Sequence, residues 1–577
     1  MRSGLAARLS LIIAPILVIL TIALFSNALL RGKVADTDSF YHIKHSWIYR
    51  TTGIFQTAFP WTQYSVINKY SSDIWYGFHI LTIPLTYFSA EGGSSSGGQD
   101  LLSGIRVGAV ITAAISLLLV FLAFKILGVK WPLFWLLVFA FASPDVLYRL
   151  SMLRPHPLSL GLALLLFAHL VNSKSEARNE LIKHEIRSTK SEAISNYQNS
   201  NDQNGFGYLN IRILDLFRIS NFEFRIFLIS AVFSWIHLAL SWLPLLIAIA
   251  IIAFQVLFKE KVDWAKIAAV PAGILLGLLS RPNPFGAAKL AYIQIFQLLS
   301  EKGDAPLRFG RELTPFVWEN FVDQLIPISL IVIIAGGFIL WLVKRKEWQS
   351  SPSSFKVASL AGLSLSLLFF ALTFLVARRS NELFIGFAVV FIAVVFTYWQ
   401  KNRQQKPGGW ASIVLTIAVL AFFFMPFKTV YRFQTYTENI RDVNRFKESA
   451  IWLKANTQPK EIVFNIHWDR FAQLFFWNDK NYYINGMDPI FEYAYDPALY
   501  WKTHFLAIDA ATSFTCGKVR CTQQETEDTR QVLKNDFKAS YLTIEKRRNP
   551  KFYKYLETAD GFKKVFENSD EAVFKIT

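Results

Sequence analysis

Two carboxylates separated by one residue lie near the start of the chain. Asp36 and Asp38 directly follow a long apolar stretch, in the segment 35–42 (ADTDSFYH). In an extended or turn backbone, both side chains can face one cation or one phosphate group. Carboxylate oxygens are the ligands that Mg²⁺ and Mn²⁺ prefer. Asp is also common as a helix cap, so the spacing alone leaves a metal site and a cap both open.

Three later segments also carry ionisable side chains beside apolar stretches. Ionisable groups near a bilayer are costly and usually mark a pathway or a site. One such segment could be an interfacial anchor, and we expect that role for Arg149, but four segments at one face predict a shared site. The three segments contain Asp145 with Arg149, Arg154 and His156, then Arg308, Arg311 and Glu312, and finally Arg378, Arg379, Asn381 and Glu382.

The composition indicates a membrane protein. The chain has 577 residues, of which 53% are hydrophobic and 18% are charged, whereas soluble domains carry about 25% charged residues. Apolar runs of about 20 residues, long enough to cross a bilayer, recur along it. These features exclude a soluble globular protein, a coiled coil and a disordered chain. The net charge of +18 suits cytoplasmic loops better than nucleic acid, because no nucleic-acid recognition motif accompanies it.

Hydropathy predicts a polytopic helical protein with about eleven spans. The first apolar stretch could be a signal peptide, but it is long for one and no small-residue cleavage site follows it. We therefore interpret it as a retained span. The predicted spans are 9–30, 101–125, 131–143, 155–172, 226–240, 241–257, 265–281, 323–343, 354–376, 383–400 and 409–429, with 226–257 divided where polar residues and Pro244 interrupt it.

The distribution of basic loops predicts a plasma (inner) membrane protein with a cytoplasmic N-terminus. Most Lys and Arg residues then lie in cytoplasmic loops, and an odd number of spans places the C-terminal region outside. The pair Arg378-Arg379 falls on the outer side against this rule, so it needs a functional reason.

These patterns divide the chain into a transmembrane domain and an extracytoplasmic α/β domain. The latter should contain a helix over 438–456 and strands over 461–466, 481–485, 539–544, 563–567 and 571–576. Cys516 and Cys521 are either free thiols or, as we favour outside the cytoplasm, a short disulfide. The predicted parts are 1–430 for the membrane domain, 31–100 for its first outer loop with an amphipathic surface helix over 74–88, 173–225 for a polar cytoplasmic insertion that follows no periodic pattern, 91–98 for a flexible linker, and 431–577 for the outer domain.

Several motifs together resemble the GT-C superfamily of membrane glycosyltransferases, in particular oligosaccharyltransferase catalytic subunits. The D-x-D-S-F-Y-H segment followed by Phe59-Pro60-Trp61 is similar to the family's first acidic motif, and Asp145 falls where its second one lies. Glu312-Leu313-Thr314-Pro315 resembles its external-loop element, and His467-Trp468-Asp469 lies where the family has W-W-D-Y-G. This chain has one Asp in the second motif and reads H-W-D-R-F in the last. The resemblance therefore implies the superfamily reaction rather than asparagine-linked protein glycosylation.

The resemblance implies transfer of a sugar from a polyprenyl-phosphate-linked donor to a glycan or polypeptide acceptor. A carboxylate must activate the acceptor and positive charge must stabilise the leaving phosphate. We predict Asp36, Asp38 and Glu312 as catalytic residues, Asp38, Asp145 and Glu312 as ligands of Mg or Mn, Arg378 and Arg379 as phosphate-binding residues, and His467, Trp468 and Asp469 as acceptor-side residues.

Two other functions remain open at this stage. A transporter or flippase of lipid-linked sugars would also use charged groups in a helical bundle, although such proteins usually have two similar halves. The chain shows no internal repeat, and its acidic groups gather at one predicted face. The other alternative is a non-catalytic assembly factor.

Overall fold

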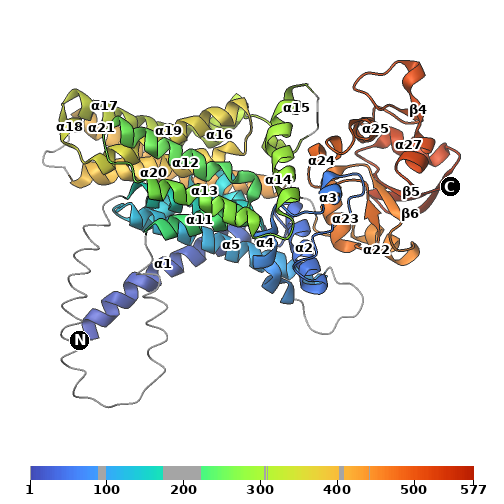
Figure 1. Cartoon of the computed structure of the whole chain (residues 1–577), viewed down its shortest axis with the longest axis horizontal. Helices are drawn as coiled ribbons and strands as arrows, with labels where there is room; N and C mark the ends of the chain where they lie inside the picture. The colour runs from blue at the N-terminus through green and yellow to red at the C-terminus, as the bar shows by residue number, and fades with distance from the viewer. Residues whose placement is uncertain are drawn as a thin grey trace, which may run out of the picture.

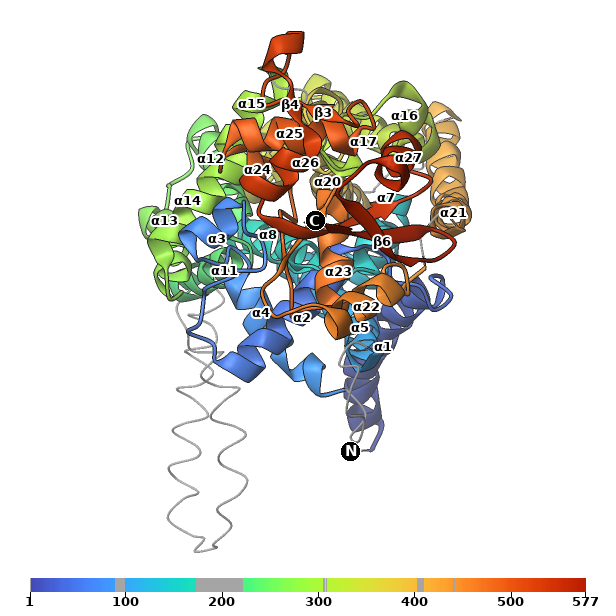
Figure 2. The ribbon, with the colours of Figure 1, turned by 90° about the vertical axis from the view of Figure 1, so that its right-hand side faces the viewer.

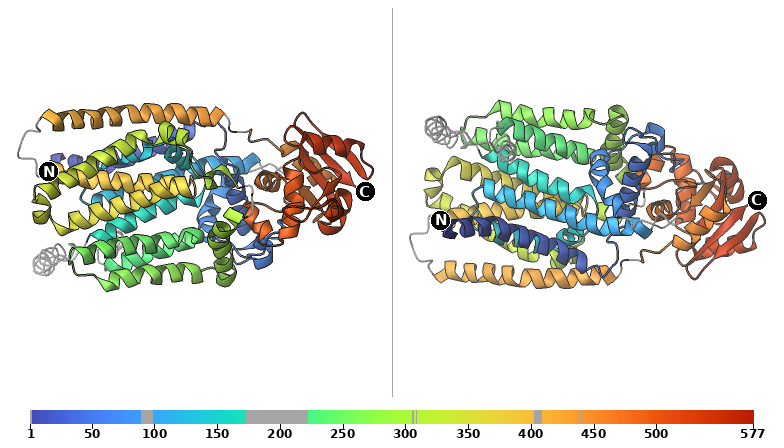
Figure 3. Two further views of the ribbon diagram at one scale, coloured as in Figure 1. Left: turned by 90° about the horizontal axis from the view of Figure 1, so that it is seen from above. Right: turned by 90° about the horizontal axis from the view of Figure 1, so that it is seen from below.

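The computed structural model consists of a helical bundle with an α/β domain at one end (Figures 1 and 3). It describes residues 2–88, 99–172, 222–304, 307, 309–401, 409–438, 440 and 442–577. The predicted linker 91–98, residues 173–221 of the predicted insertion, and Arg308 lie outside this part of the chain.

Most of the predicted apolar stretches lie within one helix and its flanking turn, whereas 323–343 begins in one short helix and continues in the next. Within the described part of the chain, six helices are long and apolar enough to cross a membrane, or up to eight segments if each bent pair is one span. The number of spans therefore stays a prediction. The long bundle helices are α1 (Arg2–Ala28), α5 (Gln99–Ile126), α6 (Pro132–Phe141), α8 (Pro155–Val171), α11 (Phe222–Ile236), α12 (Trp242–Leu257), α13 (Trp264–Leu279), α17 (Ile326–Lys344), α19 (Ser353–Leu375), α20 (Ser380–Lys401) and α21 (Gly409–Glu438).

Close packing holds α13 against α11. A side chain at Gly273 would meet the carbonyl oxygen of Phe227 at 2.2 Å, and one at Gly277 would meet that of Ala231 at 2.3 Å. Small residues four apart let two helix backbones approach this closely, which is a common way to join helices in lipid. At the centre of the bundle, 83% of the most apolar window of α20 lies inside the protein, and every residue of the shorter apolar helix α8 is buried.

Breaks in the helices bring polar residues to the end of the bundle that carries the α/β domain. The predicted interruption between α11 and α12 is confirmed by a short 3₁₀ turn, η2 (Leu238–Leu240). Helix α6 bends by 98° into α7 (Pro144–Leu150), and α13 bends by 113° into the segment that begins with α14 (Pro284–Tyr292). The shorter bundle helices are α15 (Leu298–Asp304), η4 (Arg311–Leu313), α16 (Trp318–Gln324) and α18 (Glu347–Ser350), with a π-helical turn, η3 (Ile293–Gln297), before α15.

The first loop is compact. Helix α2 (Asp38–Thr52) is buried over most of its length and is followed by α3 (Val66–Tyr70), α4 (Tyr76–Thr82) and the 3₁₀ turn η1 (Ile83–Tyr87). The predicted amphipathic helix over 74–88 is thus two short helices. Phe78 is fully buried, whereas Leu81 is half exposed.

A five-stranded mixed sheet in the order β2-β1-β5-β7-β6 forms the core of the α/β domain (Figure 2). Strand β1 runs parallel to β2 and β5, and β7 runs antiparallel to β5 and β6. The predicted strands are confirmed, including the final hairpin. They are β1 (Ile462–Asn465), β2 (Tyr482–Tyr483), β5 (Ala539–Glu545), β6 (Phe562–Glu567) and β7 (Glu571–Ile576). The helices are α22 (Lys447–Asn456), η5 (Trp468–Arg470), α23 (Phe471–Trp477), α24 (Pro489–Tyr493), α25 (Pro497–Ala507), η6 (Gln523–Glu525), α26 (Thr529–Gln531), η7 (Val532–Asp536) and α27 (Pro550–Thr558).

The predicted helix over 438–456 is wrong in its first half. Helix α21 ends at Glu438 and α22 begins at Lys447. Phe446 has a left-handed backbone, with φ of 61°, and a non-glycine residue in this region interrupts a helix. The chain turns here to pass from the bundle into the sheet.

The first loop joins the α/β domain through its backbone. Tyr483 on β2 donates its N–H to the carbonyl of Trp61 at 2.8 Å, and Gln63 donates to the carbonyl of Tyr483 at 2.8 Å. The side chains of Lys44 and Asp479 form an ion pair at 2.8 Å. The Phe59-Pro60-Trp61 segment thus leads into an added edge of the sheet, which ties the domain to the bundle.

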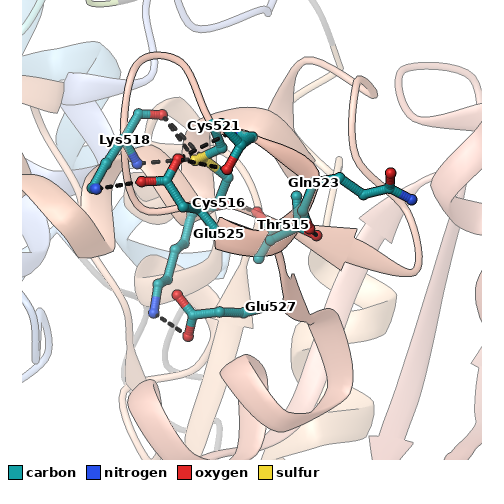
Figure 4. The surroundings of a disulfide bond; sticks show 10 residues. Thr515, Cys516, Lys518, Cys521, Gln523, Glu525 and Glu527 are labelled. Atoms are coloured by element: carbon teal, nitrogen blue, oxygen red, sulfur yellow. Dashed lines mark hydrogen bonds and ion pairs between the residues drawn. A yellow bond between two sulfur atoms is a disulfide. The ribbon is translucent and has the colours of Figure 1, made fainter.

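A disulfide joins Cys516 and Cys521 (Figure 4). It lies beside a two-stranded sheet of β3 (Phe514–Thr515) and β4 (Glu527–Asp528), which the sequence did not predict. Lys518, inside the loop, pairs with Glu525 at 2.6 Å.

Candidate active site

Charged side chains from four segments meet where the bundle faces the α/β domain. They come from the start of α2, from α7 and the residue before α8, from η4, and from the turn between α19 and α20 together with the first turn of α20. Five carboxylates and four guanidinium groups form this cluster, which we call the arginine–carboxylate cluster: Asp36, Asp38, Asp145, Glu312, Glu382, Arg149, Arg154, Arg378 and Arg379.

Arg154 connects both carboxylates of the D-x-D pair to Glu312. Its guanidinium group lies 3.1 Å from Asp36 and 3.3 Å from Glu312, and it also pairs with Asp38. Asp36 in turn accepts hydrogen bonds from the backbone and hydroxyl of Ser39, at 2.9 and 2.8 Å. Asp36 therefore also caps the start of α2, so a cap and a charged site are both present.

Glu312 lies at the centre of the cluster. Arg149 donates to it at 2.8 Å and Arg379 at 2.6 Å. Burial raises the pKa of Glu312, but the guanidinium groups of Arg379, Arg154 and Arg149 outweigh burial and hold it well below its usual range. Glu312 is therefore ionised near neutral pH. The backbone N–H of Arg379 also donates to the carbonyl of Glu312 at 2.9 Å, so η4 and the α19–α20 turn are held as one unit.

Asp145 and Arg378 form a two-point contact beside this centre. Arg378 donates from Nη2 to Oδ1 at 2.7 Å and from Nε to Oδ2 at 3.2 Å. Asn381 also donates to Oδ2, at 3.1 Å. A planar guanidinium fork suits such bidentate pairing, and an ammonium group cannot reproduce it.

Arg149 is not the interfacial anchor that we expected. It is 8% exposed, contacts Glu312 and pairs with Glu382, which is 6% exposed. An anchor would extend its charge to water or headgroups. The sequence did not predict the ion pair between Arg149 and Glu382, because these residues are 233 positions apart.

Asp38 retains a proton more readily than a free Asp does. Burial raises its pKa to about 6, and the negative charges of Asp36 and Glu312 add to this increase, while the positive charge of Arg154 opposes it. Asp488, at the start of α24, was not predicted from the sequence. Burial raises its pKa to about 7, and the charges of Arg379, Glu312 and Asp38 act on it. Its side chain accepts a hydrogen bond from the backbone N–H of Ile490 at 3.1 Å and so caps α24.

The predicted metal ligands contact arginine in this arrangement. Among the described residues, Asp38, Asp145 and Glu312 do not form a group of three whose ligand oxygens all lie within 4.8 Å of one another. Each is paired with a guanidinium group instead. Arginine thus supplies the positive charge that a divalent cation would bring, and the prediction of Mg or Mn stays a prediction.

The predicted acceptor-side residues lie in the α/β domain at different distances from the cluster. Trp468 approaches Gly310, which lies two residues before Glu312. A Cβ atom added to Gly310 would be 3.7 Å from the Trp468 ring and 3.8 Å from the Glu312 side chain. Asp469 pairs with Arg548 at 3.0 Å, and His467 contacts Asn549 at 2.7 Å within the domain. Only Trp468 of the three is shown beside the cluster.

The fold has counterparts among solved membrane proteins, although no protein-family model and no curated protein matches the sequence. The oligosaccharyltransferase of Archaeoglobus fulgidus in its apo form matches with a TM-score of 0.53 and 10% identity, over 97% of this chain and 74% of that one. The same enzyme tethered to an acceptor peptide with the NVT sequon matches with a TM-score of 0.51 and 12% identity, over 97% and 74%. ArnT from Cupriavidus metallidurans matches with a TM-score of 0.49 and 10% identity, over 98% of each chain. The fold of this chain is therefore similar to that of the archaeal oligosaccharyltransferase, as the resemblance of its motifs implies.

Proposed function

We propose that this protein is an integral-membrane glycosyltransferase that moves a sugar or oligosaccharide from a polyprenyl-(pyro)phosphate donor to an acceptor outside the membrane. The observation that carries the proposal is the arginine–carboxylate cluster, located where the bundle meets the α/β domain. The shared fold supports the reaction class, and the archaeal oligosaccharyltransferase of similar fold holds a tethered acceptor peptide in one of its structures.

The accessible face of the cluster has the groups that the reaction requires. The side chains of Arg378 and Arg379 are 24% and 28% exposed, whereas those of Arg149 and Arg154 are each 9% exposed. Asp38 and Glu312 are the more exposed carboxylates, at 20% and 27%. A substrate therefore meets two carboxylates and two arginines, while the buried members hold them in place.

The reaction follows from these positions. A carboxylate, Asp38 or Glu312, accepts the proton of the acceptor hydroxyl or amide as the acceptor atom bonds to the anomeric carbon. The bond between that carbon and the phosphate oxygen breaks, and its electron pair leaves with the phosphate. Arg378 or Arg379 stabilises the negative charge, because a guanidinium group binds two phosphate oxygens at once. Trp468 beside Glu312 would contact the acceptor at the rim.

A transfer assay with purified protein tests this function. The protein is incubated with a panel of polyprenyl-phosphate and polyprenyl-pyrophosphate sugars and with membrane extract as the acceptor source, and release of the lipid phosphate is measured. We expect release with at least one donor. Replacing Arg379 with Ala should slow it by about 100- to 1000-fold, and Arg379→Lys should slow it less. Movement of intact donor across vesicles without lipid-phosphate release would instead indicate a flippase.

A further inference from the structure

A second cluster of buried ionisable groups lies in the first loop and plays no part in the proposed reaction. It contains His45 on α2, Asp73 before α4, and His79 on α4, which are 4%, 4% and 0% exposed. Buried polar groups of this kind need partners, and a metal ion is one of the partners that such residues take.

The inner atoms of these three residues converge. His45 Nε2, Asp73 Oδ2 and His79 Nδ1 all lie within 4.8 Å of one another. Asp73 Oδ2 is 2.6 Å from His79 Nδ1 and 3.9 Å from His45 Nε2. Two imidazoles and one carboxylate are a ligand set that zinc uses with an open fourth position.

The outer atoms are held in the way that metal ligands usually are. His45 Nδ1 contacts the hydroxyl of Tyr41 at 2.9 Å, and His79 Nε2 contacts Nδ1 of His42 at 2.8 Å. The other oxygen of Asp73 accepts from the backbone N–H of Trp75 at 2.8 Å. Such outer partners fix the ring orientation and tautomer of ligating histidines. With both outer nitrogens as donors, the inner nitrogens of His45 and His79 carry the lone pairs, and the two rings stack with their centroids 4.3 Å apart.

A metal-free hydrogen-bond network accounts for only part of this arrangement. It explains Asp73 and His79, which are at hydrogen-bond distance, and Tyr49, whose hydroxyl donates to Asp73 at 3.0 Å. It holds His45 through Nδ1 alone, because Nε2 is 3.9 Å from Asp73 Oδ2, too far for a hydrogen bond. Zinc–ligand distances of about 2.0–2.1 Å place the ligand atoms of a tetrahedral site about 3.3 Å apart. This value lies between the 2.6 Å that separates Asp73 Oδ2 from His79 Nδ1 and the 3.9 Å that separates it from His45 Nε2.

We propose that His45, Asp73 and His79 bind a zinc ion, with Tyr49 or a water molecule at the fourth position. The ion would join α2, whose first residue is Asp38, to the segment that leads into α4. Its role would be to hold the first loop in shape, separate from the arginine–carboxylate cluster and independent of the reaction proposed above.

Metal analysis of the full-length protein tests this site. The protein is purified through a tag without histidine, and bound zinc is measured by mass spectrometry of the elements. We expect about one zinc ion per wild-type chain and per His169→Asn chain, because His169 is a buried histidine elsewhere, and a loss of at least tenfold in His45→Ala. Equal zinc in His45→Ala and the control would contradict the proposal.

A second measurement does not depend on a variant that folds. Wild-type protein is stripped with a chelator and titrated with Co²⁺, whose absorption bands report a site with nitrogen and oxygen ligands. We expect saturation at one equivalent, displacement by zinc, and a higher melting temperature with zinc than without it. Absence of both the bands and the melting shift would overturn the site.

Discussion

Arg149 and Arg154 are the residues that hold the site together. Each has a side chain that is 9% exposed and each contacts two or three carboxylates. A buried charge that loses its partner is strongly destabilising, whereas an exposed pair contributes little. Removing an arginine from a buried pair should therefore lower the stability of the protein far more than removing one from an exposed pair.

Replacing Arg149 with Gln should destabilise the protein by about 3–5 kcal/mol, because it leaves Glu382 buried without its guanidinium partner. The matched control is Arg432→Gln. Arg432 pairs with Asp323 at 2.6 Å, but both side chains are more than one third exposed, so its loss should cost about 1 kcal/mol or less. Thermal unfolding in detergent measures both, and equal melting temperatures for the two variants would contradict the described burial.

The pKa of Asp38 predicts how transfer depends on pH. Its pKa is raised to about 6 by burial, so the carboxyl group takes up a proton as the pH falls through that value. A protonated carboxyl cannot accept the acceptor proton, and kcat/KM should therefore fall below pH 6 and level off above it. A profile that stays flat down to about pH 5 in folded protein would show that Asp38 does not act as a base.

At the scale of elements, Lys44 and Lys454 offer a paired test of how the α/β domain is held. Both contact Asp479, at 2.8 and 3.0 Å, but the Lys44 side chain is 4% exposed and that of Lys454 is 44% exposed. Lys44→Met should loosen the first loop from the domain, because Lys44 is the partner that comes from the loop. We expect hydrogen exchange at Tyr483 to rise at least tenfold in Lys44→Met and to remain unchanged in Lys454→Met. The reverse order would contradict the docking described here.

Local patterns predicted most elements, because helices in lipid and strands in a small sheet each leave a periodic signal. The helices of the bundle and the strands β1, β2, β5, β6 and β7 were found in this way. The backbone pairing of Trp61 with Tyr483 was not predicted, because these residues are over 400 positions apart and no side chain makes the contact. A backbone hydrogen bond leaves no signature in side-chain type.

The sequence predicted which residues belong to the candidate site better than it predicted which of them contact one another. Asp36, Asp38, Asp145, Glu312, Arg378 and Arg379 all belong to the cluster. Which arginine pairs with which of these carboxylates depends on tertiary distances, which residue types alone do not contain. Asp488 was missed because a single Asp before a Pro is a common helix start.

For the whole molecule, the arrangement of the ends bears on orientation. The N-terminus lies at the end of the bundle opposite the α/β domain (Figure 3). Combined with the basic loops, this supports a cytoplasmic N-terminus and an outer α/β domain. Alkaline phosphatase fused after Thr577 should be active. A fluorescent protein that does not fold when it is exported unfolded should show no fluorescence when it is fused at the same position. A fluorescent fusion at Thr577 would place the cluster on the cytoplasmic side and contradict the proposed outer reaction.

The most direct test of the central claim compares transfer by wild-type protein with transfer by Asp38→Asn. The substitution keeps the size of the side chain and removes its charge, and Asp323→Asn serves as the control, because Asp323 pairs with Arg432 outside the cluster. With a lipid-linked donor that the wild type uses, we predict a loss of about 100- to 10,000-fold in Asp38→Asn and none in Asp323→Asn. Wild-type turnover by folded Asp38→Asn would show that the arginine–carboxylate cluster is not the site of sugar transfer.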